Sequence, residues 1–222
     1  MRPTLIWIHG GAWMRRHASE RSREILSAQG LHVVTATHRL SDEAIWPAQL
    51  DDVREAARAA RAERPDAPLL VGGRSSGGHL ALQLGLRGID APDDVAGVIA
   101  VSPPVDPLAA DWPESRAAGS PWSRLLGHVP TPLDDVTADA TPANHVGNGV
   151  PVLLLHGADD TTVPPTQALD LAGALLASGH PVTTYLRSGD HDLDLERDDV
   201  RQVIAAFLSV PALTAARDPA VS

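Results

Sequence analysis

Short runs of aliphatic and β-branched residues alternate along this chain with longer stretches in which apolar positions recur at helical spacing. Six of these runs predict strands, and three of the six carry so little polarity that both of their faces are expected to be buried. Such alternation is typical of a parallel sheet with helices on both faces. The strand candidates are residues 4–9, 31–37, 68–72, 95–101, 151–156 and 182–187.

Helical periodicity is clearest in three of the intervening stretches. Residues 47–63 place four apolar side chains on one face, residues 167–179 end at a glycine that can stop a helix, and residues 198–208 carry an apolar stripe. The pattern therefore predicts an α/β fold in three layers, an α/β/α sandwich whose mainly parallel sheet has about six strands. The apolar positions are Leu50, Val53, Ala57 and Ala60, and Val200, Val203, Ile204, Phe207 and Leu208.

Two regions depart from this alternation. Residues 103–148 are rich in proline and weakly periodic, and we expect them to form a short insertion over the edge of the sheet. Residues 211–222 are expected to be a flexible tail. Because the chain has 222 residues and no internal linker, the remainder, residues 1–210, is expected to form a single domain.

Charge and composition narrow the class of protein. The formal net charge of −10 argues against non-specific nucleic-acid binding, which needs a basic surface. The chain has no cysteine, which excludes disulfides and thiol chemistry. No stretch approaches the roughly 20 apolar residues that span a membrane. We therefore expect a cytoplasmic protein without nucleic-acid or membrane partners.

The segment "VGGRSSGGHLAL", residues 71–82, contains a G-x-S-x-G motif centred on Ser75. A serine becomes a nucleophile when a sharp turn projects it towards a base, and such a turn brings the residues two before and two after it so close that both must be nearly free of side chain. A glycine-rich turn that only packs, or that binds a phosphate, is the alternative. Because the motif lies between a predicted strand and a predicted helix, Ser75 is the candidate nucleophile.

The segment "LIWIHGGAW", residues 5–13, follows a predicted core strand with two glycines. Backbone N–H groups in such a turn can stabilise the oxyanion that forms when a carbonyl is attacked. An ordinary strand-to-helix loop is the alternative. The position of the turn after a core strand favours the oxyanion interpretation.

Two later segments supply the remaining groups of a catalytic triad. "VLLLHGADDTTVP" offers Asp159 and Asp160 after a strand, and "YLRSGDHDLD" offers His191. The order Ser, Asp, His along the chain, with room for whole βα units between them, is the order of such a triad. A metal site built from "DHDLD" with His9 or His156 is a further interpretation.

Together the four segments resemble the α/β-hydrolase superfamily, and within it the hormone-sensitive-lipase-like esterases and the related arylformamidases. The resemblance covers residue 4 to about residue 209, through "HGGAW", "GRSSGGHLAL" and "HGADDTTVP". It implies a triad of Ser75, Asp160 and His191 that needs no cofactor and no metal. By the same matching, Gly11, Ala12 and the N–H of Ser76 would hold the oxyanion.

The resemblance implies a serine hydrolase of small carboxylic esters that works through an acyl-enzyme. An arylformamidase is the enzymatic alternative, suggested by "HGGAW" and by Arg74, which could attract a carboxylate. A non-catalytic binding protein with the same fold is the alternative from another class. Because no N-terminal cap is expected, the pocket should be shallow, and its candidate walls are Trp13, Trp46, Trp112 and Trp122.

The predicted sheet departs from the family at one edge. Relatives carry strands before the one that leads to HGG, whereas this sequence begins at that strand, a minimal form of the fold. The right-handed crossover places residues 31–37 beside residues 4–9 and leaves their outer side unpaired. We therefore expect either a homodimer through this edge or an upstream segment that is missing from the chain.

Overall fold

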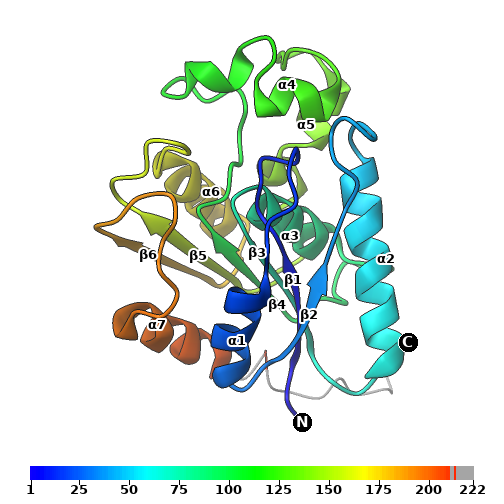
Figure 1. Cartoon of the computed structure of the whole chain (residues 1–222), viewed down its shortest axis with the longest axis vertical. Coiled ribbons are helices and arrows are strands. Elements are labelled where there is room, and N and C mark those ends of the chain that lie inside the picture. The colour runs from blue at the N-terminus through cyan, green and yellow to red at the C-terminus, as the bar shows by residue number, and fades with distance from the viewer. Residues whose placement is uncertain (211–212, 214–222) are drawn as a thin grey trace.

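The computed structural model describes residues 1–210 and residue 213. Six parallel strands form one sheet in the order β2-β1-β3-β4-β5-β6, which confirms the predicted parallel sheet (Figure 1). The strand ends lie within two residues of those predicted. The strands are β1 (Thr4–Ile8), β2 (His32–Ala36), β3 (Leu69–Arg74), β4 (Gly97–Val101), β5 (Val152–Gly157) and β6 (Val182–Arg187).

Helices cover both faces of this sheet, and the sandwich of three layers is also confirmed. One face packs against α2, α3 and α6, and the other packs against α1 and α7. The helices are α1 (Glu20–Ala28), α2 (Ala48–Glu63), α3 (Ser76–Arg87), α4 (Pro121–Leu126), α5 (Asp135–Asp139), α6 (Thr166–Ala177) and α7 (Asp198–Leu208), with short 3-10 turns η1 (Pro113–Arg116) and η2 (Pro142–His145).

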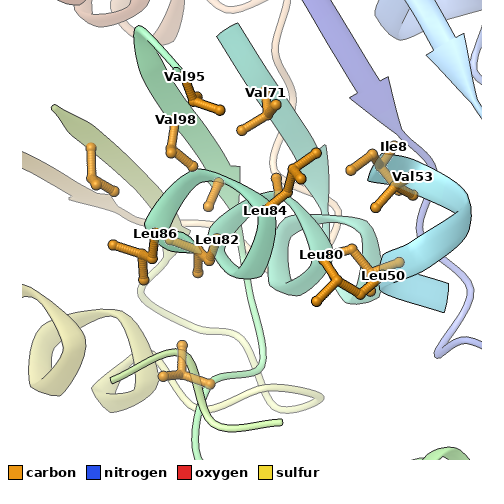
Figure 2. Close-up of a cluster of buried hydrophobic side chains, with 14 of the residues drawn as sticks. Ile8, Leu50, Val53, Val71, Leu80, Leu82, Leu84, Leu86, Val95 and Val98 are labelled. Carbon is orange, nitrogen blue, oxygen red and sulfur yellow. The ribbon is translucent and has the colours of Figure 1, made fainter. Parts of the chain in front are cut away.

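Each face of the sheet has its own hydrophobic cluster, and α3, the helix that begins immediately after the predicted nucleophile turn, belongs to the first of them. Figure 2 shows α3 packed against the strands, with Leu84 on the side that faces Val71 and Leu80 beside Leu50 of α2. The leucines at positions 80, 82 and 84 are fully buried, as are Val71 and Val98 on the strands below. Burying each leucine contributes about 1.5–3 kcal/mol, so this packing fixes the helix, and with it residue 75, on the sheet.

The proline-rich segment lies elsewhere than we expected. Residues 103–148 carry α4 and α5, which stand at the top of the molecule in Figure 1, beyond the carboxyl ends of the strands. Trp122 of α4 contacts Trp13 with 4.8 Å between ring centroids, and η2 packs on α3 and α6. The segment is therefore held over the turn that precedes α3, because its aromatic side chains are buried there rather than along an edge strand.

The strand β2 forms one edge of the sheet, as predicted, and pairs with β1 along its inner side. Within the described part of the chain no strand pairs with its outer side. We expect a second copy to pair there, because an exposed edge without proline or lysine invites strand addition. Light scattering should then give the mass of a dimer; a monomer whose amides at residues 32–36 exchange rapidly would contradict this.

No helix in residues 1–210 is both long and apolar enough to span a bilayer. The cytoplasmic location stays a prediction. The expected tail, residues 211–222, lies outside the described residues apart from Leu213, which is buried against the α1 and α7 face.

Candidate active site

The turn between β3 and α3 holds Ser75 in a backbone conformation that residues other than glycine rarely adopt. Its φ is +52° and its ψ is −124°, and its N–H donates to the Val101 carbonyl at 2.7 Å. A Cβ on Gly73 would lie 2.4 Å from the Gly77 carbonyl, and one on Gly77 would lie 2.2 Å from the Ile8 carbonyl. Both glycines of the G-x-S-x-G motif are therefore required sterically, and the turn projects Ser75 from the sheet.

His191 lies within hydrogen-bonding distance of Ser75. It follows β6 in the loop that leads to α7, and its Nε2 lies 2.9 Å from Ser75 Oγ. Its Nδ1 lies 2.7 Å from Asp160 Oδ2. Because a carboxylate only accepts hydrogen bonds, Nδ1 carries the proton and Nε2 is free to accept the Ser75 hydroxyl. The three predicted triad residues thus form one hydrogen-bonded series.

Asp160 lies at the carboxyl end of β5 and is 5% exposed. Its Oδ1 accepts from the N–H groups of Thr162 and Val163 at 2.8 and 2.9 Å. Burial raises the pKa of this carboxyl, but hydrogen bonds from His156, His191 and the Val163 N–H outweigh burial and hold the pKa well below its usual value. Asp160 is therefore ionised, which is the state that can orient and stabilise an imidazolium.

His156 is a residue of this site to which the sequence alone gave no role in the triad. It is fully buried on β5, and its Nε2 lies 3.2 Å from Asp160 Oδ2 and 3.0 Å from the Val163 carbonyl. It therefore fixes the oxygen of Asp160 that meets His191. The sequence pattern that indicates this residue is the histidine of "HGADD", which lies four residues before the triad acid and near the end of the strand.

Asp159 has a different place. Its Oδ2 accepts from Ser188 Oγ and from the Gly189 N–H, both at 3.0 Å, and the residue is exposed. It anchors the start of the loop that carries His191 without contacting the imidazole. The two neighbouring acids thus have different partners. Asp160 binds the imidazole of His191, whereas Asp159 binds the loop that carries it.

The turn at Gly11 and Ala12 presents free backbone donors beside Ser75. Gly11, Ala12 and Trp13 have φ of +122°, +55° and +57°, and the Gly11 carbonyl accepts from the N–H groups of Met14 and Arg15. Within the described residues, no hydrogen bond engages the N–H of Gly11, Ala12 or Ser76. The predicted donors are thus available to an acceptor.

Aromatic packing holds this turn. Trp13 is 2% exposed, and its ring meets His79 edge-on at 5.1 Å and Trp122 at 4.8 Å between centroids. Its carbonyl accepts from both the N–H and the hydroxyl of Ser41. The packing of the Trp13 ring and the hydrogen bonds to its carbonyl therefore stabilise a left-handed backbone conformation that would otherwise be unfavourable for a tryptophan.

His79 stands at the centre of this aromatic cluster, four residues after Ser75. Burial lowers its pKa to about 3, and its Nε2 lies 2.8 Å from the Ala140 carbonyl, so it is neutral and donates there. In the unfolded chain the pKa of His79 is about 6.5, which is above its pKa in the folded protein. The contribution of neutral His79 to stability is therefore fully present above pH 6.5 and is lost as the pH drops towards about 3.

We expect His79→Gln, which keeps a donor for Ala140, to weaken this pH dependence. Each unit of pH in that window should change the wild-type folding equilibrium by up to about tenfold through this residue. Urea unfolding of both proteins at pH 7 and pH 4.5 measures the difference. Equal losses of stability on acidification would contradict the assignment.

Two cavities open beside Ser75. The smaller, here the apolar pocket, has a volume of about 190 Å³ and is walled by Trp13, Trp112, Trp122 and Val163. The larger, here the polar cavity, has a volume of about 460 Å³, and His191 lines it together with Arg15, His17 and Arg74. Ser75 and Ala12 line both, so a ligand at Ser75 can extend into each.

The prediction that Trp46 walls the pocket is wrong. Trp46 is 4% exposed and belongs to the core, with its ring 5.6 Å from that of His79. Its Nε1 donates to Asp139 Oδ2 at 2.7 Å, and the guanidinium of Arg87 lies over the ring. Because Trp46 lies directly before α2, which packs beside α3, its ring reaches the far side of the aromatic cluster from Ser75.

The acidic segment after β6 does not build a metal site with the histidines considered for it. His156 is engaged by Asp160 and Val163, while His9 bonds the Gly10 carbonyl and stacks on His38. Across residues 1–210, no cluster of three or more histidine, aspartate or glutamate side chains is placed to hold a metal ion.

A strained serine at a strand-to-helix turn of a parallel sheet, with a histidine and an acid supplied by later strands, defines the class of α/β-hydrolase folds. The chain belongs to the BD-FAE family, whose model matches residues 1–175.

Two curated relatives are named as esterases. The chain is 28% identical over 217 residues to esterase LipC of Mycobacterium tuberculosis, covering 87% of this chain and 53% of LipC. It is 33% identical over 106 residues to the versiconal hemiacetal acetate esterase of Aspergillus parasiticus, covering 46% of this chain and 34% of that protein. The chain thus spans about half or less of the length of these curated relatives.

A solved structure shows the same fold. A truncated carbohydrate esterase from gut microbiota superposes with a TM-score of 0.82 at 23% identity, over 95% of this chain and 86% of that one.

Proposed function

We propose that the protein is a serine hydrolase that cleaves small carboxylic esters through an acyl-enzyme. The observation that supports this most is the hydrogen-bonded series from Ser75 Oγ through His191 to Asp160, with distances of 2.9 and 2.7 Å. Its relatives LipC and the versiconal hemiacetal acetate esterase are named as esterases, which supports the same reaction. A non-catalytic role is less favoured, because such proteins usually lack a triad member.

In this mechanism His191 Nε2 takes the hydroxyl proton of Ser75 as Oγ attacks the ester carbonyl. The N–H groups of Gly11, Ala12 and Ser76 stabilise the oxyanion, each donor contributing about 3 kcal/mol. His191 then gives the proton to the leaving alcohol, and the acyl group remains on Ser75. A water then attacks the acyl carbon and gives a proton to His191 Nε2. As the bond between the acyl carbon and Oγ breaks, His191 returns this proton to Oγ, which releases the acid and restores the Ser75 hydroxyl.

Each partner acts on a different part of the reaction. Asp160 holds the imidazole with Nδ1 protonated and stabilises the positive charge that forms on it. Its own position is fixed by His156 and by two backbone N–H groups. No metal or cofactor has a part in these steps.

The apolar pocket supports a preference for short acyl groups. Its volume of about 190 Å³ is below the roughly 300–1,000 Å³ of typical ligand sites, and tryptophans close it. We expect kcat/KM for p-nitrophenyl acetate, propionate and butyrate to exceed that for p-nitrophenyl esters with acyl chains of ten or more carbons. A panel of increasing acyl length tests both the hydrolase proposal and this preference.

Trp112→Ala should shift the optimum to longer chains, because Trp112 is a partly exposed wall whose loss costs less stability than that of buried Trp122. A wild-type preference for acyl chains of ten or more carbons would contradict the proposal. So would an optimum that Trp112→Ala leaves unchanged.

The arylformamidase alternative is less favoured. It rested partly on Arg74, whose Nη2 donates to the Leu193 carbonyl at 2.6 Å and whose Nη1 lies 3.9 Å from Asp192. Arg74 is therefore already engaged by the loop that carries His191. Comparing kcat/KM for N-formylkynurenine and p-nitrophenyl acetate separates the two, and we expect the ester to be the better substrate.

A further inference from the structure

The polar cavity lies on the side of Ser75 where a leaving group would depart. His191 must protonate the leaving oxygen, and His191 lines the polar cavity but is not part of the wall of the apolar pocket. If the acyl group occupies the apolar pocket, the alcohol part of the ester extends into the polar cavity. The side chains of that cavity therefore select the alcohol.

One wall of the polar cavity is a loop that folds back over the oxyanion turn. A Cβ on Gly11 would lie 2.1 Å from the Arg15 carbonyl and 3.0 Å from the ring of His17. Only glycine at this position, with a φ of +122°, allows the loop to approach so closely. The loop thereby brings Arg15 and His17 beside Ser75 and His191.

The cations of this loop are not equally engaged. Arg16 points to Glu43, with 2.9 Å between Nη2 and Oε2. Within the described residues, neither Arg15 nor His17 has a side-chain hydrogen bond or an ion-pair partner, although both are exposed and both line the cavity. Arg15 is thus a free positive charge at the cavity of a chain whose net charge is −10.

The opposite wall does not cancel this charge. It carries Arg74 and Asp192, which lie 3.9 Å apart and offset each other. Asp192 is the one acid among the described residues that line the cavity. Hydroxyls of Ser19 and Ser22 add further donors to the wall that carries Arg15.

We propose that the polar cavity selects esters whose alcohol part carries a carboxylate, with Arg15 as the ion-pair partner and His17 as a hydrogen-bond donor. This inference rests on the proposed ester hydrolysis. An arginine recognises a carboxylate through two parallel N–H groups, and the serine hydroxyls can donate to the same oxygens. An uncharged alcohol would leave Arg15 unpaired.

The test compares two isosteric esters, 4-acetoxybenzoate and 4-acetoxybenzamide, which differ in the charge of the leaving group. The ratio of their kcat/KM values is measured for wild type, Arg15→Gln, Arg15→Lys and Arg23→Gln. Because every protein meets the same two esters, their intrinsic reactivity cancels when the ratios are compared. Arg23 lies exposed on α1, outside the cavity lining, and its replacement removes the same charge from the chain.

We expect Arg15→Gln to lower the ratio of acid to amide by about threefold, the size of a partly exposed ion pair. Arg15→Lys should keep part of the preference, because lysine retains the charge but not the paired N–H groups, and Arg23→Gln should keep all of it. Added salt should lower the wild-type ratio, because it screens exposed charges.

Suppose that the wild type hydrolyses 4-acetoxybenzamide at its ester, but Arg15→Gln changes the ratio of the two kcat/KM values no more than Arg23→Gln does. That result would overturn this inference and leave the proposed function intact. If wild type hydrolyses neither ester, the proposed function fails and the inference falls with it.

Discussion

Replacing Ser75 with alanine should lower kcat/KM for p-nitrophenyl acetate by about 10⁵- to 10⁶-fold, the size of effect seen when a triad nucleophile is lost. Ser75 Oγ lies 2.9 Å from His191 Nε2, where it can give up its proton and attack the substrate. Alanine removes this oxygen, and with it the nucleophile. Residual turnover would come from binding and from the backbone donors alone. The variant should fold normally, because the hydroxyl does not pack in the core.

Ser76→Ala is the matched control for this prediction. Ser76 is fully buried, and its hydroxyl has no hydrogen-bond partner within the described residues, so alanine removes little from the fold. Its backbone N–H, the proposed oxyanion donor, stays in place. We expect this variant to keep most of its activity; loss of turnover at Ser76 with retention at Ser75 would move the nucleophile.

The second large effect is expected for Asp160→Asn, which should lower turnover by about 10⁴-fold. An asparagine can present an N–H to His191 Nδ1, which favours the tautomer protonated at Nε2. That tautomer cannot accept the Ser75 proton. The change also removes the charge that stabilises the imidazolium.

Asp159→Asn tests the same assignment from the neighbouring residue. Its Oδ2 accepts from Ser188 and Gly189, and an amide oxygen can still accept these two bonds. We expect less than about a tenfold loss. Steady-state kinetics of both variants, with circular dichroism to check folding, decides the matter, and a loss confined to Asp159 would refute the assignment of the acid.

Most of the sheet could be predicted because its strands carry their own signal. A parallel strand covered on both faces must be apolar along its whole length, and β1, β3 and β5 are buried almost throughout. The turn at Ser75 could be predicted because it needs glycine at two fixed positions. These are local requirements, and local requirements leave a pattern in the sequence.

The parts that could not be predicted depend on contacts between distant segments. The position of residues 103–148 follows from Trp122 packing on Trp13 and from His79 meeting Ala140. Trp46 was misplaced because a sequence does not tell which way a ring points. The contact of His156 with Asp160 likewise appears only once the loop after β5 turns back on its strand.

Whether Ser75 is the nucleophile is tested most directly by labelling the folded protein with a fluorophosphonate, followed by peptide mapping. A serine reacts with this probe only when a neighbouring base activates it, so we expect one adduct, on Ser75, in folded protein and none after denaturation. His191→Gln should slow the labelling greatly. An absence of adduct in folded protein, or an adduct on another serine, would contradict the proposal that Ser75 is the nucleophile.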